Sequence, residues 1–277
     1  AEVRDPGERL PDVTPSITDV LAARKAEGRA ALVPYVTAGH PGAGVTPELL
    51  RAVADASADV IELGIPFSDP LADGPTIQRS SFQALAQGAT AAGALEALRT
   101  FRTTHATPVV LFTYLNPVLR YGVPAFLSDA REAGAQGLLV TDLPTGADAA
   151  LEDRIRASGL DLIRLVAPTT PAERIPVVAG GGSGFLYYIS RTGVTGAREE
   201  LRATLGEEVA RVRDAVSLPV AVGFGISTPE QAAAVAAVAD GVVVGSALIQ
   251  ALDAGGVEGG AAFVAALRRG MDGHRGR

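Results

Sequence analysis

Short apolar segments alternate with helical segments along almost the whole chain, and this alternation restricts the fold more than any other feature. Each apolar segment is followed by a stretch with helical periodicity or by a turn and then a helix. The pattern predicts an α/β protein, a single (β/α)8 TIM barrel, because parallel strands buried on both faces are apolar throughout. An open doubly wound sheet is the alternative, but no GxGxxG motif follows the first strand. The predicted strands are Ala31–Thr37, Val60–Gly64, Pro108–Thr113, Gly137–Val140, Asp161–Val166, Phe185–Ser190, Pro219–Gly223 and Gly241–Gly245.

The two ends of the chain are predicted to lie outside the barrel. Residues 1–15 are charged and rich in proline and have no apolar signal region, so we expect a disordered tail. Ser16–Gly28 carries apolar residues on one helical face, which predicts an extra N-terminal helix that closes the bottom of the core. We therefore expect one domain over residues 16–272, with residues 273–277 as a C-terminal tail.

Composition excludes several classes of function. The chain has 277 residues and no cysteine, which excludes disulfides, thiolate chemistry and cysteine-based metal sites. Its histidines, His40, His105 and His274, show no zinc spacing, so we expect no metal. A net charge of -7 without a long basic run argues against nucleic acid as a partner. Every long uncharged stretch is broken by Gly, Pro or Ser, so we expect no membrane segment and a cytoplasmic protein.

The second strand and its loop carry the strongest chemical signal. Glu62 lies alone in an apolar strand, and the loop that follows is too rich in Pro and Gly to be helical. No basic residue occurs between Ala58 and Gln78, so burial of Glu62 without a cation should raise its pKa toward neutrality, as a general acid/base requires. Asp73 could be an ordinary Asp-Gly turn residue, but its place after Glu62 at the barrel mouth predicts a second role.

The last two strand–helix connections indicate a phosphate site. They contain Gly225, Gly245 and Ser246, and barrels of this class often bind phosphate at these loops and at a nearby helix start. A third Gly-rich loop, containing Thr195 and Gly196, could close over the same ligand. The alternative is a set of ordinary tight turns with serine caps.

Tyrosines occur near several strand ends. Tyr35 and Tyr114 lie at the ends of the first and third strands, and Tyr187 and Tyr188 are adjacent in the sixth, so that one points inward and the other outward. They either fill the core or form an aromatic slot for a planar ligand, and periodicity alone leaves both readings open.

Seven motifs, in order, resemble those of the tryptophan synthase alpha chain family. They are PYVTAGHP, VIELGIPFSDPLADGPTIQ, TYLNPVLRYG, LLVTDLP, YYISRTGVTG, GFGIS and GSALI, and the resemblance spans roughly residues 16–270. It implies a lyase that cleaves indole-3-glycerol phosphate to indole and glyceraldehyde 3-phosphate by a retro-aldol reaction in tryptophan biosynthesis.

The resemblance also implies roles for individual residues. Glu62 matches the family's general acid/base, and Asp73 matches the carboxylate that accepts the indole N–H. Substrate-binding positions correspond to Tyr35, Tyr114, Tyr187 and Thr195, and phosphate contacts correspond to Gly196, Gly225, Gly245 and Ser246. Tyr35 stands where phenylalanine is common in the family, so its hydroxyl needs a partner in the indole slot.

A partner is implied as well. Family members work with a beta chain that carries pyridoxal phosphate, in an alpha2beta2 complex, so we expect no cofactor in this chain. Asp69, in the loop between Glu62 and Asp73, is the candidate contact to that beta chain. A stand-alone indole-glycerol-phosphate lyase and an inactive alpha-like scaffold remain the alternative functions.

Overall fold

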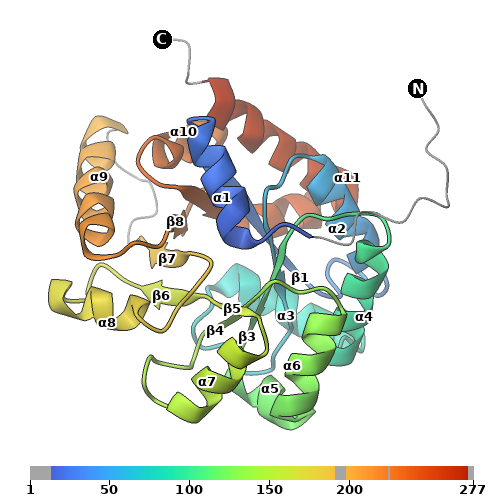
Figure 1. The fold of residues 1–277 in the computed structure, drawn as a ribbon. Helices are drawn as coiled ribbons and strands as arrows, with labels where there is room; N and C mark the ends of the chain where they lie inside the picture. The colour runs from blue at the N-terminus through green and yellow to red at the C-terminus, as the bar shows by residue number, and fades with distance from the viewer. Residues whose placement is uncertain (1–13, 191–197, 224, 274–277) are drawn as a thin grey trace.

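One parallel sheet of nine strands organises the computed structural model, which describes residues 14–190, 198–223 and 225–273 (Figure 1). The strand order is β5-β4-β3-β2-β1-β9-β8-β7-β6, and every pairing is parallel. The strands are β1 (Ala31–Thr37), β2 (Ile61–Gly64), β3 (Val109–Thr113), β4 (Gly137–Val140), β5 (Asp161–Leu162), β6 (Arg164–Val166), β7 (Leu186–Ile189), β8 (Val220–Gly223) and β9 (Gly241–Val244).

The sheet closes on itself through the segment that we predicted as one fifth strand. Its two ends, β5 and β6, are consecutive pieces of that segment and are separated only by Ile163. β5 pairs with β4 and β6 pairs with β7, while the Ile163 N–H donates to Leu138 O (3.0 Å). The predicted eight-unit barrel is therefore confirmed, with the correction that the fifth strand changes neighbours at Ile163.

Helices surround the sheet and join successive strands (Figure 1). The expected extra N-terminal helix is present as α1 and is confirmed. The helices are α1 (Ile17–Ala26), α2 (Thr46–Asp55), α3 (Pro75–Ala86), α4 (Ala91–Arg102), α5 (Leu115–Tyr121), α6 (Val123–Glu132), α7 (Ala149–Ala157), the 3-10 turn η1 (Ala172–Arg174), α8 (Ile175–Ala179), α9 (Arg198–Ala215), α10 (Pro229–Ala236) and α11 (Ser246–Asp272).

Two helices begin directly after strands. α5 begins at Leu115, where the Asp142 carboxylate accepts the backbone N–H (2.6 Å) and Pro117 falls in a first turn that needs no N–H of its own. α11 begins at Ser246, where the sequence predicted a helix start, and continues to Asp272. Within α11 only Gly256 departs from helical geometry (φ 61°, ψ -155°), where the helix kinks.

The barrel has two apolar layers. The inner layer fills the barrel and includes Ile17 and Leu21 of α1, packed with Val33 of β1 and with Val60 and Phe185, which directly precede β2 and β7. This placement confirms that α1 closes the amino end of the barrel, where it crosses the sheet in Figure 1. The outer layer packs the strands against the helices, as in other α/β barrels. The carboxyl end of the barrel remains for a ligand.

In the part of the chain that the structure describes, every helix is too short or too polar to cross a membrane. Most of the two predicted tails, residues 1–15 and 273–277, lies outside the described residues.

Candidate active site

A cavity of about 530 Å³ opens at the carboxyl ends of the strands. Its wall combines carboxylates, aromatic rings and glycine-rich loops, which is typical of a ligand site in this class of barrel. The described lining residues include Tyr35, Glu62, Asp73, Ile77, Phe112, Thr141, Leu165, Tyr187, Ile189, Gly225, Ser227, Val243, Gly245, Ser246 and Gln250. Most site residues predicted from the sequence are therefore brought together in one place.

Glu62 is a buried carboxyl group that forms no ion pair with any described residue. Its position in β2 directs it into the barrel, where the residue is 1% exposed. Its Oε1 atom meets no hydrogen-bond donor among the described residues. Burial raises the pKa of Glu62 to about 8, because the charged form loses its hydration without gaining a partner. The group is therefore poised to exchange a proton near neutral pH.

Asp73 lies across the cavity from the barrel wall, on the loop before α3. Tyr114 Oη donates to Asp73 Oδ2 (2.8 Å) and accepts the Ala72 N–H (3.1 Å), so one phenol holds both the carboxylate and its loop. Burial raises the pKa of Asp73 to about 6, and the hydrogen bond from Tyr114 opposes that rise. Tyr114 touches the loop rather than lining the cavity, which places this predicted substrate-binding residue behind Asp73.

Tyr35 and Tyr187 form opposite parts of the aromatic wall, and each needs a glycine beside it. A Cβ at Gly64 would lie 2.1 Å from Tyr35 Oη, and one at Gly223 would lie 2.3 Å from Tyr187 Oη. The Tyr35 ring meets Phe112 edge to face, with centroids 5.2 Å apart. Burial raises the pKa of both phenols, so both remain protonated. The Tyr35 hydroxyl finds its required partner in Thr37 Oγ1 (3.3 Å).

The adjacent tyrosines of β7 point in opposite directions, as predicted. Tyr187 lines the cavity, whereas Tyr188 points outward and donates from its hydroxyl to Glu208 of α9 (2.8 Å). One is available to a ligand and the other ties the strand to the outer helices.

The end of the cavity near β8 and β9 has the features of an anion site. Gly225, with φ 78°, and Gly245 and Ser246 line it, and the α11 N-terminus has no side-chain cap. By contrast, the α10 N-terminus is closed by its own capping box between Thr228 and Gln231. The open N–H groups of α11 and its dipole therefore remain for an anion. None of the described lining residues is Lys or Arg.

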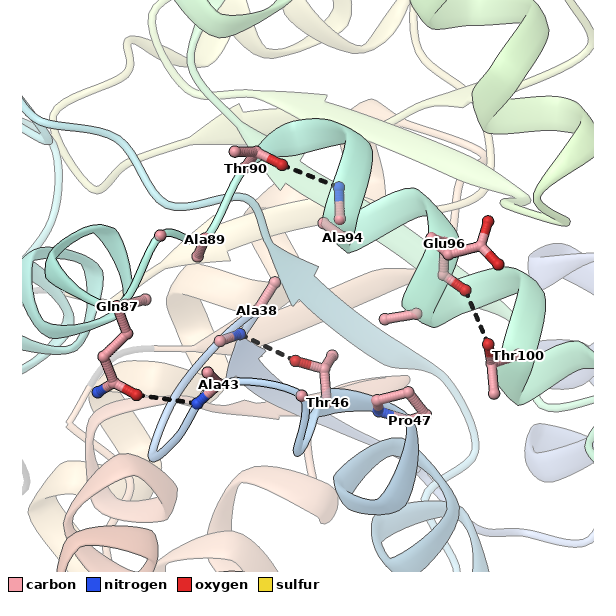
Figure 2. Close-up of a pocket in the computed structure, with 16 residues that line it drawn as sticks. Ala38, Ala43, Thr46, Pro47, Gln87, Ala89, Thr90, Ala94, Glu96 and Thr100 are labelled. Carbon is pink, nitrogen blue, oxygen red and sulfur yellow. Dashed lines mark hydrogen bonds between the residues drawn. The ribbon is translucent and has the colours of Figure 1, made fainter.

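A second cavity, of about 330 Å³, lies outside the barrel between the loop after β1, α2 and α4 (Figure 2). Its wall is mostly Ala, Gly and Thr. In Figure 2, Thr46 and Gln87 already serve as acceptors for backbone N–H groups, those of Gly39 (2.9 Å) and Ala43 (2.8 Å). This cavity contains no buried acid, so the chemistry belongs to the first one.

Some predicted site residues are not brought into the cavity. Thr195 and Gly196 lie outside the described residues. Asp69 is exposed on the loop before α3 and does not line the cavity. The sequence reading missed Thr141 and Gln250, which do line it. Thr141 could have been found because it directly follows β4, and Gln250 because it lies in the first turns of the helix predicted to start after Ser246.

Comparison with known proteins now decides the family. The family model described as tryptophan synthase alpha chain matches residues 21–271. The chain belongs to the tryptophan synthase alpha chain family. It is 50% identical over 240 residues to the tryptophan synthase alpha chain of Acidiphilium cryptum (strain JF-5), covering 86% of this chain and 87% of the relative. Identity to the alpha chain of Geobacter sp. (strain M21) is 48% over 259 residues, covering 92% and 97%.

Solved structures of the family have the same fold. The alpha subunit from Legionella pneumophila str. Paris superposes with a TM-score of 0.85 at 40% identity, covering 93% of this chain and 98% of that one. A chain of Mycobacterium tuberculosis tryptophan synthase gives a TM-score of 0.84 at 38% identity, covering 92% and 97%. The predicted resemblance is thereby confirmed for the family and for the fold.

Proposed function

We propose that this chain is the lyase subunit of a tryptophan synthase and cleaves indole-3-glycerol phosphate to indole and D-glyceraldehyde 3-phosphate. The observation that carries the proposal is Glu62, which is buried in the barrel wall in the same cavity as Asp73 and whose Oε1 atom meets no donor among the described residues. Membership of the family supports the same reaction.

In the proposed reaction, Glu62 transfers protons at both ends of the carbon–carbon bond that breaks. Protonated Glu62 gives its proton to C3 of the indole ring, and the Glu62 carboxylate then takes the proton of the hydroxyl on the neighbouring side-chain carbon. The O–H electrons form the aldehyde carbonyl, the carbon–carbon bond breaks, and its electrons return to the ring. Glu62 is protonated again at the end of the cycle.

Asp73 has the complementary role in this proposal. Protonation at C3 places positive charge on the ring, and a carboxylate that accepts the ring N–H stabilises that charge. Tyr35 and Tyr187 offer the flat apolar walls between which an indole ring would fit. The N–H groups near Gly225, Gly245 and Ser246 would hold the phosphate, with Thr195 and Gly196 contributing as the family resemblance implies.

The partner is a beta chain, in the alpha2beta2 arrangement that the family implies, and we assign pyridoxal phosphate to that partner. The loop carrying Asp69 also exposes Leu71, which is 82% exposed, and α5 exposes Leu119, which is 55% exposed. Large apolar side chains in these positions favour burial against another protein. Asp69 is the proposed polar contact on the same loop.

The test is an assay of indole release from indole-3-glycerol phosphate by the purified chain, repeated with added beta chain. We expect release in both cases and a higher rate with the beta chain. Release without any stimulation would identify a stand-alone lyase and would contradict the subunit proposal. Absence of release in both assays would contradict the enzymatic proposal and favour an inactive scaffold.

A further inference from the structure

Gln78 holds the main chain of the loop that carries Asp73, although it does not itself line the cavity. Its Nε2 atom donates to Asp73 O (2.9 Å) and to Pro70 O (3.3 Å). The Asp73 N–H also donates to Pro70 O (3.0 Å), which closes a turn. The Gln78 carboxamide therefore binds the carbonyl groups at both ends of this turn. Gln78 lies in the first turns of α3, and the position of this loop therefore follows the position of that helix.

The start of α3 is in turn fixed to the barrel wall by buried hydroxyl groups. Thr37 Oγ1 of β1 lies 2.7 Å from Ser80 Oγ and 3.3 Å from Tyr35 Oη, and Ser80 donates to Ile77 O (2.8 Å). Thr37 and Ser80 are fully buried. Hydrogen bonds between buried hydroxyls are costly to break, so they set a defined distance between β1 and α3.

We propose that Gln78 is a positioning residue that fixes Asp73 relative to Glu62, with the Tyr35–Thr37–Ser80 hydroxyl chain as its anchor. The loop is then held at two points: Tyr114 holds the Asp73 carboxylate from β3, and Gln78 holds the Asp73 main chain from α3. The inference rests on the proposed function, because it concerns the placement of the carboxylate that meets the indole N–H.

The expected consequence is a loss of rate rather than of binding. Misplacing a reacting group by about 1 Å costs up to about 100-fold in rate, so we expect a variant without the Gln78 donor to lose about 10- to 100-fold in kcat. The phosphate loops follow β8 and β9, and the hydrogen bonds of the Gln78 carboxamide go to Asp73 and Pro70 of a different loop. The KM for indole-3-glycerol phosphate and the inhibition constant for glyceraldehyde 3-phosphate should therefore change by no more than about twofold.

The experiment compares Gln78→Met with Gln83→Met by steady-state kinetics. Met keeps the length of the side chain and removes its donors. Gln83 is exposed on the same helix and outside the cavity, so Gln83→Met matches the substitution without touching the loop. We expect a drop in kcat for Gln78→Met alone, with equal thermal unfolding midpoints for the two variants.

Other outcomes are also decisive. An unchanged kcat in Gln78→Met would overturn the inference, and so would equal losses in both variants. If Gln78→Met does not fold, Gln78→Ala provides the same test with a better helix former. An inactive wild type would count against the proposed function rather than against Gln78. In that case the fluorescence of a bound indole ring in each variant would report whether Gln78 shapes the site. A spectrum unchanged in Gln78→Met would overturn the inference.

Discussion

Asp59 and Glu62 are near neighbours in the sequence and are both buried, yet the fold treats them in opposite ways. Asp59 precedes β2 at the amino end of the barrel, is 8% exposed, and accepts hydrogen bonds from Arg24 Nε (2.6 Å), Arg268 Nη1 (3.2 Å) and the Leu32 N–H (2.8 Å). Glu62 is 1% exposed, and its Oε1 atom finds no donor among the described residues.

This contrast separates a structural carboxylate from the one to which we assign a catalytic role. A buried charge is stable only when it is paired and hydrogen-bonded, so the Asp59 network ties α1 and α11 to the start of β2. No described residue gives Glu62 such compensation, and the raised pKa that results is what proton transfer near pH 7 needs. Asp59 and Glu62 are both buried, so the difference between them lies in the hydrogen-bond donors and cations around each carboxylate.

The largest expected effect comes from replacing Glu62 by its amide. Glu62→Gln keeps the shape and removes the transferable proton, so kcat for indole release should fall by about 1,000-fold or more. Folding and binding of glyceraldehyde 3-phosphate should persist, because the phosphate loops are untouched. The measurement is indole release, with phosphate-ligand binding as the control. Retained turnover would show that Glu62 is not the proton carrier.

Asp59→Asn, at the amino end of the barrel, should lower the stability of the fold and leave kcat almost unchanged. Asp59→Asn leaves the Arg24 and Arg268 guanidinium groups without their shared charge, and we expect a loss of about 3 kcal/mol in the free energy of unfolding. Urea denaturation measures this loss. At a temperature where the variant is folded, kcat should stay within about twofold of the wild type. A large fall in kcat with little loss of stability would reverse the assignment of the two acids.

The pH dependence of kcat/KM tests the unpaired acid directly. Glu62 must be protonated to begin the reaction, and burial raises its pKa to about 8, so activity should fall above about pH 8. Asp73 must be ionised, and its pKa is about 6, so activity should fall below about pH 6. Each limb should approach about tenfold per pH unit. A profile that stays flat to pH 10 would contradict the assignment of Glu62.

The same titration affects stability in a defined direction. The pKa of Glu62 is raised above its ordinary value of 4.5, so the folded state binds this proton more tightly than the unfolded state. The contribution is fully present below about pH 4.5 and is lost as pH rises through about 8. Glu62→Gln should remove this part of the decline, which thermal unfolding at pH 6 and pH 9 can detect.

The sequence predicted the burial of Glu62 without a nearby cation by an argument that would have failed for Asp59. The absence of basic residues near Glu62 in the sequence turned out to match an absence of donors to its Oε1 atom among the described residues. Asp59 also has no close basic neighbour, but its partners Arg24 and Arg268 lie 35 and 209 residues away. Local spacing cannot reveal ion pairs that form only when the barrel closes.

The sequence predicted the fold where apolar runs mark the strands. It did not predict features that depend on contacts between distant parts of the chain. Apolar runs located the strands, but nothing in the pattern around Ile163 marks the point where one strand changes neighbours. The helix start at Ser246 was predicted, but residue types did not show that Gln250 on this helix lines the cavity. The positions of Tyr114 and Gln78 behind Asp73 depend on the path of a loop, which residue types alone do not specify.

Asp73 is intermediate between Asp59 and Glu62, because its carboxylate accepts a hydrogen bond from the Tyr114 phenol. Tyr114→Phe should therefore produce the smallest effect of these variants. The hydrogen bond from Tyr114 lowers the pKa of Asp73 against the effect of burial, so its loss should move the acidic limb of the rate profile to higher pH. A hydrogen bond to a charged group contributes about 1.5 kcal/mol or more, which corresponds to about a tenfold loss of kcat/KM near pH 6.

Near pH 8 that loss should shrink, because Asp73 is then ionised in either protein. Tyr121→Phe is the matched control, since Tyr121 donates to Asp129 (2.5 Å) on the outer helices and does not line the cavity. A loss that is equal at pH 6 and pH 8 would mean that Tyr114 positions the loop without tuning its charge. Tyr114 would then have a structural role, as the partners of Asp59 do. Asp73 would no longer be intermediate between Asp59 and Glu62 in how its charge is stabilised.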